Sequence, residues 1–274
     1  MKAIALAFIG LMTFGTIACH AKKVKGNGNI ITKEIQVSDY NEIKVGQGIE
    51  SGNMSFTKKN KSPRFNYTQQ SGSASLNITI DENLLPLLNI QSNGNVLTIG
   101  TGMGTQINPT QLEINSHSKE LRKLGISGGM DFFLQSKLTG DNLEINASGA
   151  SDVYLENSVR ISNLCKISLS GASDVKASNL ECDKIECRSS GSSDIKMSGK
   201  ANDGEYHCSG SSDIKSYDFV VKRLKCSASG SSDILTNVTE KLNASASGSS
   251  DIKYKGNPEV KKSSSGSSDI DHVN

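Results

Sequence analysis

The phrase Ser-Gly-Ser-Ser-Asp-Ile stands at residues 190–195 and recurs unchanged at four later places in the chain. Two earlier copies read Ser-Gly-Ala-Ser-Asp-Val, and a looser copy, Ser-Gly-Gly-Met-Asp-Phe, precedes them. The aspartates of successive copies are 18 to 22 residues apart, which is the period of a solenoid whose repeating unit is one coil. The eight copies begin at residues 127, 148, 170, 190, 209, 229, 247 and 265.

The residues before each aspartate alternate between apolar and polar side chains, which is typical of a strand with one buried face. Nine, seven and five residues before Asp152, for example, stand Leu143, Ile145 and Ala147. A second strand follows each aspartate, with apolar residues one and three positions after it in most copies. Segments such as 180–182 indicate a third side, so the expected coil has three short strands.

The Gly-Ser-Ser-Asp phrase then forms the corner between the first two strands. Glycine adopts backbone angles that other residues avoid, and Ser and Asp side chains bond to nearby backbone groups in turns. Counterpart strands of successive coils would pair in parallel, about 4.8 Å apart, and parallel connections favour a right-handed coil. The sequence therefore predicts an all-β protein, a right-handed parallel β-helix.

The composition fits such a stack and excludes one class of partner. Hydrophobic residues make up 35% of the 274 residues and aromatic residues 5%, and Trp is absent. This is thin for a conventional globular core, but each coil needs only a few small inward side chains. The net charge is +2 and the lysines are spread along the chain, so the sequence predicts no nucleic-acid groove.

The first 18 residues read as an export signal of the lipoprotein type. Residues 3–17 form an apolar run behind a positive start, and about 15 residues are too few for a good membrane span. The Thr-Ile-Ala-Cys stretch at 16–19 resembles a bacterial lipobox, which predicts lipidation of Cys19. Plain cleavage near Ala21 is the alternative. The chain is thus predicted to be exported to the cell envelope as an outer-membrane lipoprotein, on a face that the sequence leaves open.

Five further cysteines form an odd-numbered set whose spacing matches neither a disulfide framework nor a zinc ribbon. Cys187 and Cys208 are one coil apart but two residues out of register. Strand dimensions then separate their Cα atoms by roughly 8 Å, beyond disulfide reach. All five are therefore predicted to be free thiols, buried as small apolar side chains: Cys165, Cys182, Cys187, Cys208 and Cys226.

The chain ahead of the regular repeat carries strand signals without the phrase. Residues 19–35 are expected to be a linker and a first strand, and 36–126 a β region of less regular coils with a hairpin or two. The turn Ser-Asn-Gly-Asn at 92–95 is a strong hairpin signal. Residues 127–274 are assigned to the regular repeat.

Several of these segments together resemble the head GIN domain proteins, an adhesin-like family found mainly in Bacteroidetes. The resemblance is carried by Tyr-Asn-Glu-Ile-Lys-Val at 40–45, Leu-Leu-Pro-Leu-Leu-Asn-Ile at 84–90, the hairpin at 93–99 and the repeated corner phrase. It covers roughly residues 36–270. It implies a β-helical, envelope-associated protein whose domain has no known function, and it supplies no catalytic residue.

The column of aspartates is the sharpest candidate for chemistry, because neighbouring carboxylates about 5 Å apart repel by roughly 1 kcal/mol per pair in water. The first interpretation is structural, with each carboxylate accepting bonds from Ser hydroxyls and backbone amides at its corner. A second is a calcium-binding β-solenoid. A polysaccharide-active β-helix enzyme is a third, but it needs two acids in unlike environments. The calcium candidates are Asp152, Asp174, Asp194, Asp213, Asp233 and Asp251.

No other residues predict a catalytic or cofactor site. The four histidines are scattered without triad or ligand spacing, and no serine stands in a nucleophile-elbow context. We therefore expect a non-enzymatic adhesin-like binding module without a cofactor, which presents a Ser/Asp ladder to an envelope polysaccharide or another envelope protein. Because the repeats run to Asp269, the last coil exposes a strand edge that invites self-association, although Lys261 and Lys262 would blunt it.

Overall fold

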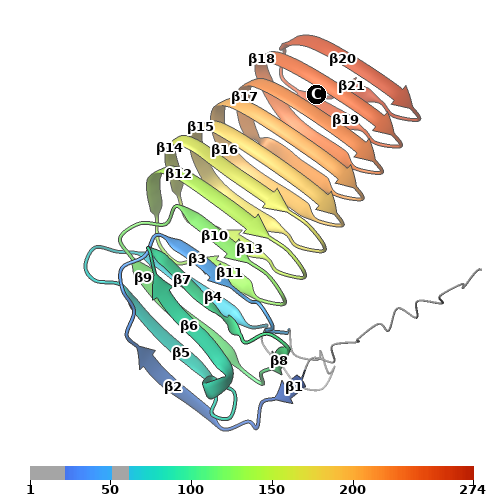
Figure 1. Ribbon diagram of the computed structural model, residues 1–274. Coiled ribbons are helices and arrows are strands. Elements are labelled where there is room, and N and C mark those ends of the chain that lie inside the picture. Colours follow the sequence, from blue (N-terminus) through green and yellow to red (C-terminus); the bar gives the residue numbers. More distant parts are fainter. Residues whose placement is uncertain (1–21, 51–61) are drawn as a thin grey trace, which may run out of the picture.

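The computed structural model describes residues 22–50 and 62–274. Residues 1–18 and Cys19 therefore lie outside the described residues, and the export signal and its lipidation stay predictions. The described chain is built from strands, apart from one three-residue 3-10 turn, η1 (Leu85–Leu87). Within that part of the chain no helix is long and apolar enough to cross a membrane. Figure 1 shows the strands stacked side by side into one elongated rod, with the C-terminal coil at its far end.

The repeats form a parallel β-solenoid, as predicted. Each strand pairs in parallel with its counterpart one coil later, and the register aligns the repeated phrases, so that Asp194 pairs with Asp213 and Asp213 with Asp233. Shifts of register recur within each long strand and mark its bends. The strands are β12 (Leu138–Ala147), β13 (Val153–Leu155), β14 (Val159–Leu169), β15 (Val175–Gly191), β16 (Asp194–Gly210), β17 (Asp213–Gly230), β18 (Asp233–Gly248), β19 (Ile252–Lys255), β20 (Glu259–Gly266) and β21 (Ile270–His272).

The core runs along the rod axis and consists of the alternating residues that the repeat identified. Leu143, Ile145 and Ala147 are buried, and so are their counterparts in the following coils as far as β18, whereas those in β20 of the last coil are not. Each column mixes sizes: Tyr206 lies between Cys187 and Cys226 in the stack. Large and small side chains can therefore interdigitate from coil to coil, which gives a packed core without Trp.

The N-terminal half contains coils of the same rod, but they do not stack in chain order. β3 (Glu42–Val45) pairs in parallel with β7 (Val96–Thr101) on one side and with β10 (Lys123–Ile126) on the other. The chain therefore first forms the strand β3. It then forms β7, on the side of β3 toward the N-terminal end of the rod, and after that β10, on the opposite side of β3, where the regular repeat begins. The same order holds on a second side, where β4 (Arg64–Gln69) lies between β9 (Leu112–Ser118) and β11 (Asp131–Leu134). The less regular coils expected for this region are present, in an order that differs from the order of the chain.

Antiparallel strands close this end of the rod. The predicted hairpin joins β6 (Leu88–Asn93) to β7 through Gly94 and Asn95, which both have positive φ, as a tight two-residue hairpin turn requires. β5 pairs antiparallel with β2 and with β9, and β1 pairs in parallel with β8 in a small separate sheet. The bounds are β1 (Lys22–Lys25), β2 (Ile30–Ile35), β5 (Ser75–Asp81) and β8 (Thr105–Asn108).

Candidate functional site

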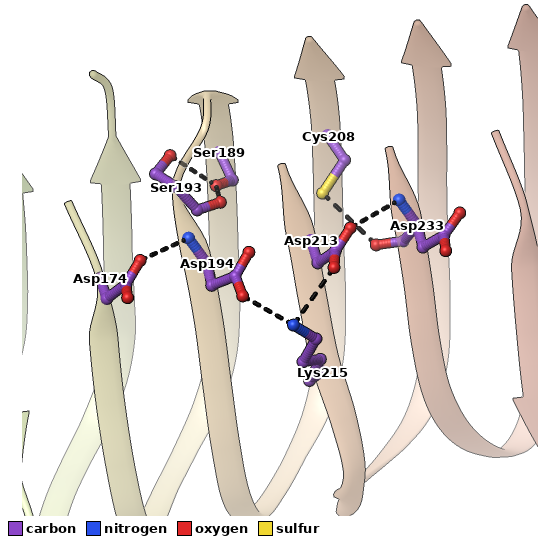
Figure 2. A network of polar contacts seen from close by, with 8 residues as sticks. All are labelled: Asp174, Ser189, Ser193, Asp194, Cys208, Asp213, Lys215 and Asp233. Carbon is purple, nitrogen blue, oxygen red and sulfur yellow. Dashed lines mark hydrogen bonds and ion pairs between the residues drawn. The ribbon is translucent and has the colours of Figure 1, made fainter. Parts of the chain in front are cut away.

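The aspartates of the repeat form one continuous column at the corner of the rod. In most steps the main-chain amide of one aspartate donates a hydrogen bond to the carboxylate of the aspartate one coil earlier, as Asp194 does to Asp174 at 2.9 Å (Figure 2). A carboxylate that accepts a backbone amide is stabilised in its charged form, which offsets repulsion along the column. The other amide donors are Asp152, Asp174, Asp233, Asp251 and Asp269, at 3.4, 3.2, 3.1, 3.1 and 3.3 Å.

One step of the column is held by a lysine instead. The amide of Asp213 donates to the carbonyl of Ser193 at 3.3 Å. The ammonium of Lys215 lies 2.6 Å from one carboxylate oxygen of Asp194 and 3.2 Å from one of Asp213, as Figure 2 shows. The hydrogen bond to Asp194 is the main reason that the pKa of Lys215 is raised. A positive charge therefore bridges this step.

The serines of the phrase divide into an inner and an outer column. The serine directly before each aspartate is buried, and from Ser173 onward its hydroxyl donates to the carbonyl three residues earlier, as Ser193 does to Ser190 at 2.8 Å. These inner hydroxyls do not bond the carboxylates, contrary to the expected corner, because they are turned inward. From Asp194 onward the residue two positions before each aspartate is also a serine, such as Ser192 and Ser211, and it is exposed. The corner of these coils thus presents carboxylates and serine hydroxyls.

The first aspartate of the column differs from the rest. Burial raises the pKa of Asp131, and the negative charge of Asp152 adds to that effect. A polysaccharide-cleaving site needs such an unequal pair in a cleft. The hollow that touches the column, about 260 Å³ in volume, instead contains Asp174, Asp194 and Lys215. Among the described residues, that hollow therefore does not bring Asp131 together with a second acid.

The aspartate column was also the candidate calcium site. Each carboxylate that accepts a main-chain amide keeps a second oxygen for other partners. Among residues 22–50 and 62–274, however, no group of three or more His, Cys, Asp or Glu side chains is placed to hold a metal ion. Calcium prefers six to eight oxygen ligands, so each coil would have to supply the rest from serines and water. Calcium binding by the six aspartates stays the second interpretation of the column, after the structural one.

The five described cysteines are free thiols, and four of them are buried as predicted. Cys208 is two residues out of register with Cys187, since it pairs with Ser189. Cys182 differs from the prediction, because it is only partly buried and lines a groove on another side of the rod. Burial still raises its pKa to about 12, so the thiolate is scarce at neutral pH.

One group that the sequence analysis missed lies on the outer face of β16 and β17. His207, one of the four histidines without ligand or triad spacing in the sequence, is half-buried and contacts both Glu205 and Ser227. Their spacing could have shown it: His207 and Ser227 each stand six residues before a repeat aspartate, so they occupy the same outward position of neighbouring coils.

The chain is similar to a known family and to several solved structures. Residues 58–258 match the family described as "Putative auto-transporter adhesin, head GIN domain". A putative adhesin from Parabacteroides distasonis is 33% identical, with a TM-score of 0.82 over 92% of this chain and 100% of that one. A putative adhesin from Parabacteroides merdae is 30% identical, with a TM-score of 0.82 over 93% and 100% of the two chains.

A third solved structure carries a different description. It is a putative lipid binding protein from Parabacteroides distasonis, 31% identical, with a TM-score of 0.80 over 92% of this chain and 100% of that one. No protein of curated function matches the sequence.

Proposed function

Because this chain belongs to the head GIN domain family of adhesin-like proteins, we propose that it is an adhesin-like binding module of the bacterial cell envelope. Lipidation of Cys19 would anchor it to the outer membrane after export. Its partner would be an envelope polysaccharide or another envelope protein, and its C-terminal coil would offer a second, weaker contact for self-association.

The observation that carries this proposal is the register of the outer column. The carboxylates, most of them partly exposed, recur once per coil, and from Asp194 onward exposed serine hydroxyls recur with them, because the repeated phrases pair in register along the rod. Such a ladder matches a partner that is itself a repeating polymer, since many weak contacts at fixed spacing add up to useful avidity. The nearly uniform environments of the acids also favour binding over catalysis.

Polysaccharide is the favoured partner class, for a reason of charge. Beside the aspartates runs a second column that contains Lys176, Lys196 and Lys215. Lys215 pairs with aspartates of the first column. Ammonium, carboxylate and hydroxyl groups therefore alternate across a narrow strip, which suits a chain of sugar hydroxyls and acidic groups. The neighbour described as a lipid binding protein makes a lipid headgroup, whose phosphates and hydroxyls have related chemistry, a second arm of the test.

The test removes whole coils without disturbing register. Deleting residues 195–213 joins Asp194 to Ile214, and deleting 214–233 joins Asp213 to Ile234. In each case the isoleucine after the junction replaces the isoleucine with which it pairs in the native rod. Binding to immobilised neutral and acidic polysaccharides, and to vesicles with anionic lipid, is then measured for chains lacking one coil or both.

A graded loss of affinity with each deleted coil is the expected result. The matched control is Asp213→Asn in the full-length rod, which should lower binding only slightly if contacts are distributed. Complete loss with that single substitution, or binding that is unchanged by both deletions, would refute the repeated-contact proposal.

A further inference from the structure

A glutamate, a histidine and a serine form a hydrogen-bonded chain on the side of the rod that leads into the aspartate corner. Glu205 and His207 face outward from β16, and Ser227 faces outward from β17 in register with His207. Nε2 of His207 lies 2.8 Å from a carboxylate oxygen of Glu205. Nδ1 of the same ring lies 2.7 Å from the hydroxyl oxygen of Ser227.

The partners of the ring determine where its proton lies. A carboxylate only accepts hydrogen bonds, and the bond from His207 is the main reason that the pKa of Glu205 is lowered. In the neutral ring Nε2 therefore carries the hydrogen, and Nδ1 is left to accept the hydroxyl hydrogen of Ser227. A serine whose hydroxyl donates to an imidazole that an acid orients is the arrangement that activates a nucleophile.

The serine borders a surface hollow of about 300 Å³, large enough for a small acyl group. Lys225 and Asn243 line the same hollow as His207 and Ser227. Lys225 is two residues from Ser227 on the same outward face, and Asn243 pairs with Lys225 from the next coil. An ammonium and an amide are groups that stabilise negative charge on the oxygen of an attacked carbonyl.

We propose that Ser227 is an acyl-accepting nucleophile that His207 activates, and that its substrates are small carboxylic esters or thioesters. The hydroxyl oxygen of Ser227 attacks the carbonyl carbon while its hydrogen passes to Nδ1 of His207. Collapse of the tetrahedral adduct breaks the bond to the alcohol or thiol, which leaves with the proton from Nδ1. Water, deprotonated in turn by His207, then releases the carboxylic acid and restores Ser227. Glu205 is a positioning residue, since it acts by holding the ring.

The next coil supplies a matched control. Ser245 pairs with Ser227 one coil later and faces outward into the same hollow. Its neighbour in the preceding coil is Ser227 itself, so it has no imidazole in the position that His207 takes beside Ser227. The two hydroxyls therefore differ mainly in the presence of the base.

The experiment treats the full chain with a fluorophosphonate probe and, separately, with p-nitrophenyl acetate. We expect one equivalent of label on Ser227, identified by peptide mass spectrometry, and release of p-nitrophenolate. General-base assistance typically contributes about 100-fold or more, so Ser227→Ala and His207→Gln should each lower the labelling rate by about that factor. Ser245, which has no imidazole beside it, should take no label. Equal labelling of Ser227 and Ser245, or no effect of His207→Gln, would overturn the proposal.

The role of Glu205 is tested by the tautomer of the His207 ring, which would not change if Glu205 served only to stabilise the fold. In ¹⁵N spectra of the imidazole, the native chain should show the tautomer protonated at Nε2. Glu205→Gln, which can also accept at this nitrogen but lacks the charge, should weaken that preference and slow labelling while the melting temperature stays within a few degrees. An unchanged tautomer together with an unchanged labelling rate would remove Glu205 from the proposal. Unfolding of Glu205→Gln or of His207→Gln would be visible in the same melting measurement.

Discussion

Gly210 lies against Gly191 of the preceding coil so closely that a Cβ atom on Gly210 would stand 2.8 Å from the carbonyl oxygen of Gly191. The backbone at Gly210 also has a φ of +83°, an angle that residues other than glycine rarely adopt. In the same corner the amide of Ser211 donates to that carbonyl at 2.8 Å. The repeated glycine is therefore required both by its backbone angle and by the distance between coils.

A single methyl group at this corner should destabilise the rod measurably. For Gly210→Ala we expect a loss of about 1–2 kcal/mol from the left-handed backbone alone, and more because the coils must separate locally. Gly140→Ala is the control, since nothing lies within 4 Å of a Cβ at that position. Urea unfolding of the two variants checks the difference. Equal free energies of unfolding for the two variants would show that the corner accommodates the methyl group without loss of stability.

The aspartate column should not need calcium to fold. Asp174 accepts a hydrogen bond from the main-chain amide of Asp194 at 2.9 Å. Such a bond supplies part of the stabilisation of negative charge that a bound cation would otherwise provide. We expect calorimetric melting of the full chain in millimolar calcium and in excess chelator to give the same melting temperature. A ligand at 100 times its dissociation constant would stabilise the fold by about 2.7 kcal/mol, so a rise of several degrees that Asp233→Asn abolishes would contradict this prediction.

The regular half could be predicted because one phrase determines both the corner and the alternation beside it. Once Asp194, Asp213 and Asp233 are aligned, the inward residues of the strand before and the strand after each aspartate follow from a period of two, which holds until the chain bends. The direction of the inner serine hydroxyls did not follow, because Ser193 can bond either a carboxylate or a nearby carbonyl and only the packed corner decides between them.

The layer order of the N-terminal half could not be predicted for a different reason. β3 pairs with strands that lie more than 50 residues later in the chain, and no repeated phrase aligns them. Local alternation predicts a strand at 42–45 but says nothing about its neighbours. The contact between His207 and Ser227 lies between these cases, since the repeat aligns the two residues although no motif in sequence order joins them.

Mild alkylation of the folded chain should modify the half-buried thiol of Cys182 and leave the other four described thiols unmodified. In the folded chain with Cys19→Ser, we expect iodoacetamide to add slowly and only at Cys182, because its pKa of about 12 keeps the thiolate scarce and the other thiols are buried. Intact mass measures the number of adducts, which should rise to five after unfolding. Cys182→Ala should remove the adduct of the folded state. Fewer than five adducts in the unfolded, unreduced chain would indicate a disulfide.

A buried carboxylate fastens the N-terminal segment to the closed end of the rod. Asp81 is fully buried, and it accepts bonds from the amide of Gly28 at 2.7 Å and from the amide and hydroxyl of Thr110 at 2.8 and 2.6 Å. Burial alone would raise the pKa of Asp81, but these hydrogen bonds outweigh it and the pKa is lowered. The charged form is therefore the one that the folded state prefers.

The pH dependence of stability follows from that direction. Because the pKa is lower in the folded chain than in the unfolded one, Asp81 contributes its full stabilisation above the unfolded value of about 3.9 and loses it as the pH falls through the folded value. Asp81→Asn should cost about 1–3 kcal/mol at pH 7, with a smaller cost at pH 3. Denaturant unfolding at both pH values measures this, with the exposed Glu82→Gln as control. A cost for Asp81→Asn that does not change with pH would contradict the assignment.

The last coil carries a charged side chain that opposes pairing of its exposed strand edge with a second chain. Lys262 occupies the inward position that Ala244 takes one coil earlier, and its ammonium donates to the carbonyl of Ile270 at 2.7 Å. An inward-pointing charge on an edge strand opposes pairing with a second chain. Self-association through this coil should therefore be weak in the native chain.

Removing that charge should strengthen association. For Lys262→Leu we expect a concentration-dependent increase in dimer in sedimentation velocity, because the variant exposes an apolar, unpaired edge. Lys261→Leu is the matched control, since it removes the same charge from an outward position and should change association less. Strong dimers of the native chain that neither substitution affects would place the contact elsewhere, whereas equal effects of the two variants would assign the blunting to net charge alone.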